Sequence, residues 1–225
     1  MRRKMKTAVI ACKTIEDELR FAMERTGCDY PTVWLEQGLH NVPQQLNAAV
    51  QTALDGIGAK RVLLAMGFCG NSLRGLRVPA VELIVPRVDD CISLLLGSVK
   101  RRLEISQEYS AYFFTEGWLR GERNIWVEHQ HMLETYGEEL TEELEKDMFG
   151  HYRTLGLLDC GIKPMEPLIE GTKMIAEGLH LTQRVIPASA RYLEDLLTGP
   201  WPAERFLTVR GASTITDEDM LLPEE

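Results

Sequence analysis

Residues 61–71 have the sequence RVLLAMGFCGN, an apolar run that ends in a cysteine flanked by glycines. An unbroken apolar run of this length is typical of a strand buried on both faces of a parallel sheet. Residues 7–12, TAVIAC, have the same character and also end in a cysteine. A third run, at residues 81–85, is followed closely by Cys91. The three runs therefore predict strands of one sheet, each followed by a cysteine.

The segments between these runs have helical patterns. We expect helices at 14–25 and 43–54, a strand at 32–35, and a helix that begins at Asp89 or Asp90 and contains Cys91. Strands separated by helices form βαβ units and a mostly parallel sheet. In the second half we expect strands at 111–115, 183–187 and 205–209 and helices at 124–145, 146–157, 167–179 and 191–197. The prediction is one α/β domain, residues 1–225, with flanking helices, a helix-rich acidic second half, and a helical insertion or subdomain at about 122–182.

Composition excludes several classes of protein. The chain has 225 residues, 44% of them hydrophobic, and a formal net charge of −9. This charge argues against nucleic-acid binding, which depends on Lys and Arg. No apolar run approaches the roughly 18 residues of a membrane span. Five cysteines without an export signal predict a cytoplasmic protein with reduced thiols. The oligomeric state stays open.

The cysteines after the three predicted strands suggest a shared site. The carboxyl ends of parallel strands lie at one edge of a sheet, where ligands bind in such folds. We therefore expect Cys12, Cys69 and Cys91 to form one metal site. Soft thiolate ligands favour an iron–sulfur cluster or, second, zinc, and three of them leave a position open for a substrate. The alternative is ordinary packing, because free cysteines are often buried and no Cys-x-x-Cys pair is present.

Other polar residues follow the same strands. His40 lies in a loop after a predicted strand and can act as an acid or base or as a fourth ligand. Arg87 can bind an anion, and Asp90 can be a base, although capping of the next helix explains an aspartate there equally well. We expect Gly70 and Asn71, in the loop after Cys69, to contact the bound group. We therefore predict catalytic roles for His40, Arg87 and Asp90. We predict cofactor-binding roles for Gly70 and Asn71.

Several stretches of the sequence resemble the family known as domain of unknown function 1638. They are IAC at 10–12, WLEQGLH at 34–40, GFCGN at 67–71, VPRVDDCI at 85–92, LLGS at 95–98 and FTEGW at 114–118, with weaker similarity at LDCG, 158–161, and FLTV, 206–209. The resemblance implies cysteines at the positions of Cys12, Cys69 and Cys91 and a histidine at His40. Family members often have Asp-Thr where this chain has Asp159-Cys160, so Cys160 departs from the family pattern. This departure argues against Cys160 as a fourth metal ligand. The resemblance also implies an association with anaerobes and with corrinoid-dependent methyl transfer.

Three functional hypotheses follow. The first is a metal- or iron–sulfur-binding protein that activates a small sulfur- or methyl-containing substrate in anaerobic, corrinoid-linked one-carbon metabolism. The second is a non-catalytic accessory module for a metal or corrinoid methyltransferase system, with the acidic helical half as its partner surface. The third is a metal-free enzyme with a nucleophilic cysteine, such as Cys69 near His40. Only the first requires all three thiols to retain a metal.

Overall fold

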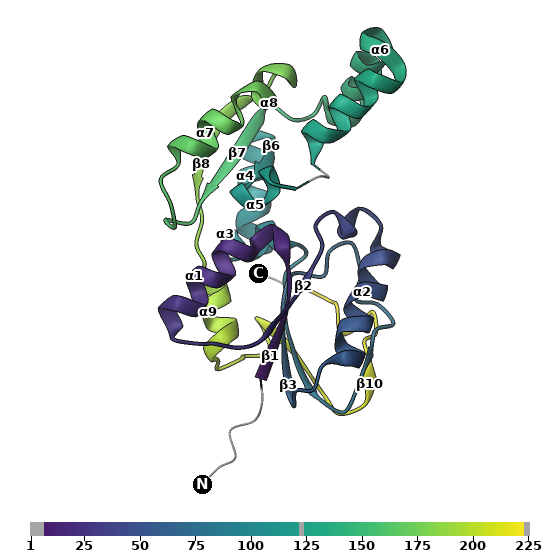
Figure 1. The fold of residues 1–225 in the computed structure, drawn as a ribbon, viewed down its shortest axis with the longest axis vertical. Helices are drawn as coiled ribbons and strands as arrows, with labels where there is room; N and C mark the ends of the chain where they lie inside the picture. The colour runs from purple at the N-terminus through teal and green to yellow at the C-terminus, as the bar shows by residue number, and fades with distance from the viewer. Residues whose placement is uncertain (1–6, 122–123, 223–225) are drawn as a thin grey trace.

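The computed structural model describes residues 7–121 and 124–222 and contains two mostly parallel sheets (Figure 1). The first sheet has the order β2-β1-β3-β5-β9, and the second has the order β6-β7-β8. A short antiparallel pair, β4 (Arg77–Val78) with β10 (Ser213–Thr214), lies beside the first sheet. The α/β class with mostly parallel sheets and flanking helices is thus confirmed. No helix in the described parts of the chain is long and apolar enough to cross a membrane.

The first sheet is formed by the apolar runs that the sequence identified. Its first four strands are parallel, and β9 runs antiparallel to β5. Nearly every residue of its central strands is buried, because helices cover both faces: α1 packs with α9 on one face and α2 covers the other (Figure 1). The elements are β1 (Thr7–Cys12), η1 (Lys13–Ile15), α1 (Glu16–Thr26), β2 (Thr32–Leu35), η2 (Leu39–Asn41), α2 (Pro43–Gly56), β3 (Arg61–Ala65), β5 (Glu82–Pro86), α3 (Cys91–Leu96), α9 (Arg191–Thr198) and β9 (Phe206–Arg210).

The second sheet lies between residues 111 and 187 and has a hydrophobic cluster of its own, which includes Phe114, Leu155 and Leu168. All three of its strands are parallel. The segment 122–182, predicted as a helical insertion or subdomain, falls within this part of the chain. The elements are α4 (Val99–Tyr109), β6 (Ala111–Phe114), α5 (Glu116–Leu119), α6 (Ile125–Phe149), β7 (Thr154–Asp159), α7 (Glu166–Gly171), α8 (Lys173–Gly178) and β8 (Thr182–Pro187).

The predicted helix at 124–145 is interrupted at Gly137, whose backbone is not helical. Two further predicted helices of the second half differ from the structure. The predicted helix at 146–157 is wrong at its end, because residues 154–159 form β7, the central strand of the second sheet. A side chain at Gly156 would approach Ile186 Cδ1 to 2.7 Å, so the glycine lets β7 and β8 pack closely. The predicted helix at 167–179 is divided into α7 and α8 at Thr172. Short buried strands and short helices have similar apolar patterns, which explains the error at β7.

Candidate functional site

Cys12, Cys69 and Cys91 meet at the carboxyl edge of the first sheet. Cys12 ends β1, Cys69 lies four residues after β3, and Cys91 begins α3 after β5. β3 lies between β1 and β5 in the sheet. The thiols of Cys12 and Cys69 both lie close enough to the thiol of Cys91 to shift its pKa. All three side chains are buried. The structure therefore brings together the three cysteines that the sequence placed at this edge.

Close contact between two loops brings Cys69 to Cys91. The Phe68 N–H donates to Val88 O at 2.9 Å, and the Cys69 N–H donates to Asp89 O at 2.7 Å. A Cβ atom at Gly67 would lie 2.7 Å from the backbone of Asp90. Any side chain at position 67 would therefore force the loops apart.

The loop at Cys69 has an unusual backbone. Cys69, Gly70 and Asn71 all have positive φ, of 43°, 65° and 62°. A cysteine in the left-handed region is uncommon and costs free energy, and such strain is concentrated at functional sites. Gly70 lines the cavity described below, whereas Asn71 is exposed and outside its lining.

The surroundings of Cys12 and Cys91 favour the protonated thiol. The hydrogen bond to Cys91 and burial raise the pKa of Cys12 well above its usual value. For Cys91, contact with Cys12 lowers the pKa, but the hydrogen bond with Cys69 and complete burial raise it by more. Other hydrogen bonds act in the opposite direction: the side chain and the backbone of Thr14 lower the pKa of Cys12, and the backbone at Gly67 lowers that of Cys91. The Cys12 thiol itself donates to Thr14 Oγ1 at 3.1 Å.

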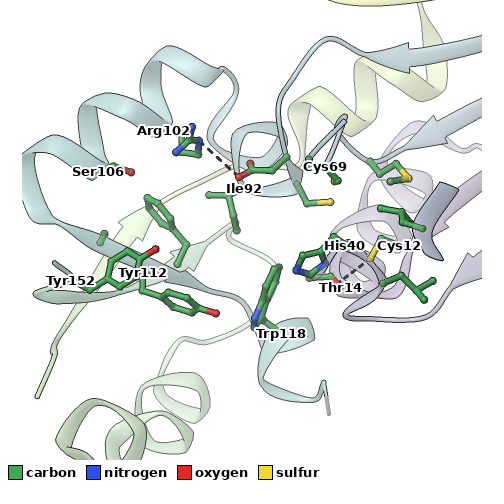
Figure 2. A pocket seen from close by; sticks show the side chains of 18 of the residues that line it. Cys12, Thr14, His40, Cys69, Ile92, Arg102, Ser106, Tyr112, Trp118 and Tyr152 are labelled. Carbon is green, nitrogen blue, oxygen red and sulfur yellow. Dashed lines mark hydrogen bonds and ion pairs between the residues drawn. The ribbon is translucent and has the colours of Figure 1, made fainter. Parts of the chain in front are cut away.

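The three thiols open into a cavity of about 670 Å³ between the two sheets. Figure 2 shows Cys12, Thr14, His40 and Cys69 on one side of it and Tyr112, Tyr152, Ser106 and Arg102 on the other, with Trp118 between them. The size is that of sites for small organic molecules. The wall opposite the thiols is largely aromatic, formed by Tyr112, Phe113, Tyr152 and His151.

Of the three predicted catalytic residues, two line this cavity. The His40 ring lies 5.1 Å from the Trp118 ring, and burial lowers the pKa of His40, which favours the neutral imidazole. Asp90 caps α3 by accepting a hydrogen bond from Ser93 N at 2.7 Å, and burial together with the charge of Asp89 raises its pKa. Arg87 lies elsewhere: its guanidinium donates to the carbonyl oxygens of Asp219 and Leu221, each at 2.9 Å, and it is not part of the cavity wall. The structure thus gives Arg87 a contact with the C-terminal segment in place of one with the site.

Sequence reasoning missed the residues that the second half contributes. Arg102 of α4 reaches the wall and is paired with Asp89 at 2.6 Å. Tyr112 and Tyr152 contact each other edge to face, with centroids 5.3 Å apart, and burial raises the pKa of Tyr112 to about 12. The indole N–H of Trp118 is buried near the Tyr112 hydroxyl. It makes no hydrogen bond of good geometry to that hydroxyl or to any other group in the described parts of the chain. No local motif marks these residues, since their association depends on how the two sheets face each other.

Cys160 has a different setting. It follows β7 and lines a second, smaller cavity of about 30 Å³, together with Glu18 of α1. Burial, with the charges of Glu18 and Asp159, raises the pKa of Cys160. Glu18 is 6% exposed, one of its carboxyl oxygens has no hydrogen-bond partner in the described parts, and burial raises its pKa to about 7. The structure does not bring Cys160 to the three thiols as a fourth ligand.

The donor set of the three thiols suits a thiophilic metal, but the side chains are not in coordination geometry. Across residues 7–121 and 124–222, no group of three His, Cys, Asp or Glu side chains is arranged to hold a metal ion. In their present positions the thiols of Cys12 and Cys69 each influence the pKa of Cys91. Backbone groups that already hydrogen-bond to two of the sulfurs are a feature that thiolate-bound metal centres use to tune the metal. The residues therefore fit a metal chemically, and binding requires loss of the thiol protons and a rearrangement of the three side chains.

The fold and the site define an α/β protein with three thiols at the carboxyl edge of its first sheet, next to a cavity between the two sheets. The family described as Protein of unknown function (DUF1638) matches residues 34–197, and the chain belongs to this family. The match includes Cys69, Cys91 and His40, whereas Cys12 lies before it. Comparisons with curated proteins and with solved structures gave no match.

Proposed function

We propose that this protein binds an iron–sulfur cluster, or secondarily zinc, through Cys12, Cys69 and Cys91 and holds a small-molecule substrate beside it. The observation that supports this proposal most strongly is the contact among three thiols from three strand ends at the wall of a ligand-sized cavity. Isolated buried cysteines are ordinary packing residues. Three that converge, each after a different strand and next to a cavity, are better explained by a shared ligand.

The raised pKa values of Cys12 and Cys91 argue against either of these two residues as a free nucleophile. A thiol in such surroundings stays protonated near neutral pH and is a poor nucleophile. A metal cation reverses this balance, because it displaces the protons and binds the thiolates. The backbone hydrogen bonds at Thr14 and Gly67 would then stabilise the thiolate form.

The rest of the cavity supplies groups that can position a substrate. A cluster or zinc ion held by three thiolates supplies a Lewis-acid position for a donor atom of the substrate. The neutral imidazole of His40 can exchange a proton with the bound molecule, and the free indole N–H of Trp118 can donate to one of its acceptors. Asp90 is placed to accept a proton or hydrogen bond at the same wall.

For the substrate we propose a small molecule with a sulfur or methyl group. A sulfur donor suits a thiophilic metal with an open position. The link to methyl transfer and to corrinoid or methyltransferase proteins comes from the family resemblance and not from any residue of the cavity. Arg87 has no part in this proposal because it lies outside the cavity wall.

A metal-free nucleophile is the second candidate, and the backbone of Cys69 favours it. Its positive φ holds the residue in a strained conformation at the cavity wall, which His40 also lines. In this case Cys69 alone would be essential, and Cys12 and Cys91 would be packing residues.

Anaerobic purification followed by measurement of iron, zinc, acid-labile sulfide and the visible spectrum tests the proposal. We expect iron and sulfide in cluster stoichiometry with a charge-transfer band in the visible spectrum. Zinc without sulfide would keep the site and change its chemistry to that of the secondary metal. Absence of metal after anaerobic reconstitution with iron, sulfide or zinc would contradict the proposal and favour the nucleophile.

A further inference from the structure

The segment labelled α6 is a helical hairpin. Gly137 has φ 76° and ψ 173°, which no helix permits. His129 Nδ1 lies 2.5 Å from Glu145 Oε1, although 16 residues of continuous helix would separate them by roughly 24 Å. The chain therefore folds back at Gly137, and residues 125–136 and 138–149 form two antiparallel arms.

The hairpin projects from the rest of the molecule. Figure 1 shows α6 extending away from both sheets. Its attachment is at the base, where Ile125 is buried, Asn124 caps the first arm and Trp126 packs against Gly178. Helices of about 12 residues have little stability alone, so an exposed pair of this length gains stability from any surface that covers it.

Apolar side chains remain exposed on both arms. Tyr136 and Leu140 flank the turn, and Val127 and Met148 lie near the base, each between 38% and 53% exposed. Only a few hairpin side chains are buried beyond its base, among them His129, Met132 and Thr141. Exposed apolar groups on a projecting element are characteristic of protein interaction sites.

The hairpin also carries most of the net charge of the chain. Residues 125–149 contain eight acidic side chains and one lysine, a net charge of −7 with histidine neutral, against −9 for all 225 residues. A second copy of the hairpin would bring the same charge and be repelled, as would nucleic acid or an anionic lipid surface. A protein face with basic and apolar side chains complements both properties.

We propose that the hairpin 125–149 is a docking site for a partner protein with a basic, partly apolar face. The hairpin adjoins the cavity: Trp118 precedes it, His151 and Tyr152 follow it, and all three line the cavity wall. The base of the hairpin is therefore next to the cavity wall in the chain, whereas its turn projects away from both sheets (Figure 1). The inference does not depend on metal binding, because it rests on the charge and exposure of the hairpin.

The test uses a fluorescently labelled amphipathic helical peptide of lysine and leucine, titrated by anisotropy. We expect binding that weakens by about tenfold between roughly 50 and 200 mM salt, because the charges involved are exposed. In Glu134→Gln/Glu138→Gln/Glu142→Gln, affinity at low salt should fall about tenfold. In Tyr136→Ser/Leu140→Ser, affinity at the higher salt concentration should fall by a similar factor.

The matched control removes three exposed carboxylates from other elements, in Glu24→Gln/Glu204→Gln/Glu218→Gln. It should change affinity by less than about twofold. An equal loss in the control would show attraction to overall charge only and would overturn the proposal, as would absence of binding. Sedimentation of the unmodified protein gives a further test: a dimer that the Tyr136→Ser/Leu140→Ser variant dissociates would assign the hairpin to a second copy and contradict the proposal. Circular dichroism checks that each variant is folded.

Discussion

The two sheets both have cysteine at their carboxyl edges, but the neighbours of the cysteines and the size of the adjoining cavity differ. At the first sheet, Cys12, Cys69 and Cys91 contact one another and face a cavity of about 670 Å³. At the second sheet, Cys160 stands without another cysteine beside the buried Glu18, in a cavity of about 30 Å³. Both edges follow the rule that functional groups occur after parallel strands. The difference shows that position after a strand is not enough and that convergence with other donors and space for a ligand distinguish a site.

The largest predicted effect on the free energy of unfolding is that of substituting the buried Glu18. Its pKa is about 7 in the folded protein against a usual value of 4.5, so the folded state retains this proton longer than the unfolded state. The resulting stability is complete below the usual pKa and is lost as the pH rises to about 7. Glu18→Gln should therefore stabilise the protein at pH 8 by up to about 3 kcal/mol and have little effect at pH 4.

Urea unfolding at both pH values measures this effect. Glu24→Gln, at an exposed position of the same helix, is the matched control and should show neither change. Equal stability of Glu18→Gln and the unmodified protein at pH 8 would contradict the view that Glu18 is an unpartnered buried carboxyl.

Gly67→Ala should damage the three-thiol edge without changing a thiol. The new Cβ would meet the Asp90 backbone at 2.7 Å, and separation of the two loops would move Cys69 away from Cys91. We expect a loss of about 2 kcal/mol in the free energy of unfolding, together with weaker metal retention. Gly58→Ala is the control, because a Cβ there meets no atom within 4 Å. Retention of full stability and metal in Gly67→Ala would show that the loop contact is not required.

Thr14→Val tests the smallest of these effects. The hydroxyl accepts the hydrogen bond of the Cys12 thiol, and valine keeps the shape but cannot accept it. The expected loss is about 1 kcal/mol in thermal or urea unfolding of the metal-free protein. Thr52→Val, at an exposed position of α2, should change stability less. A larger loss of stability from Thr52→Val than from Thr14→Val would contradict a stabilising role of the hydrogen bond between Cys12 and Thr14.

The sequence was sufficient for the first sheet and for the convergence of its cysteines. Long apolar runs with intervening helical patterns predict parallel strands, and the carboxyl ends of such strands lie at one edge. It was insufficient for β7, whose buried run after a long helix has no strand-specific periodicity, and for the cavity wall formed by Tyr112 and Tyr152. That wall depends on the packing of two sheets against each other, which local patterns do not encode. Arg87 shows the same limit, because its partners Asp219 and Leu221 are more than 130 residues away in the chain.

The most direct test of the central claim is the metal content of four variants in which one cysteine is replaced by serine, each reconstituted anaerobically with iron and sulfide. Cys12→Ser, Cys69→Ser and Cys91→Ser should each lose most of the bound metal, because each removes one of three ligands, whereas Cys160→Ser should retain it. Retention of metal by any one of the first three variants, or its loss only in Cys160→Ser, would contradict a metal site shared by the three thiols.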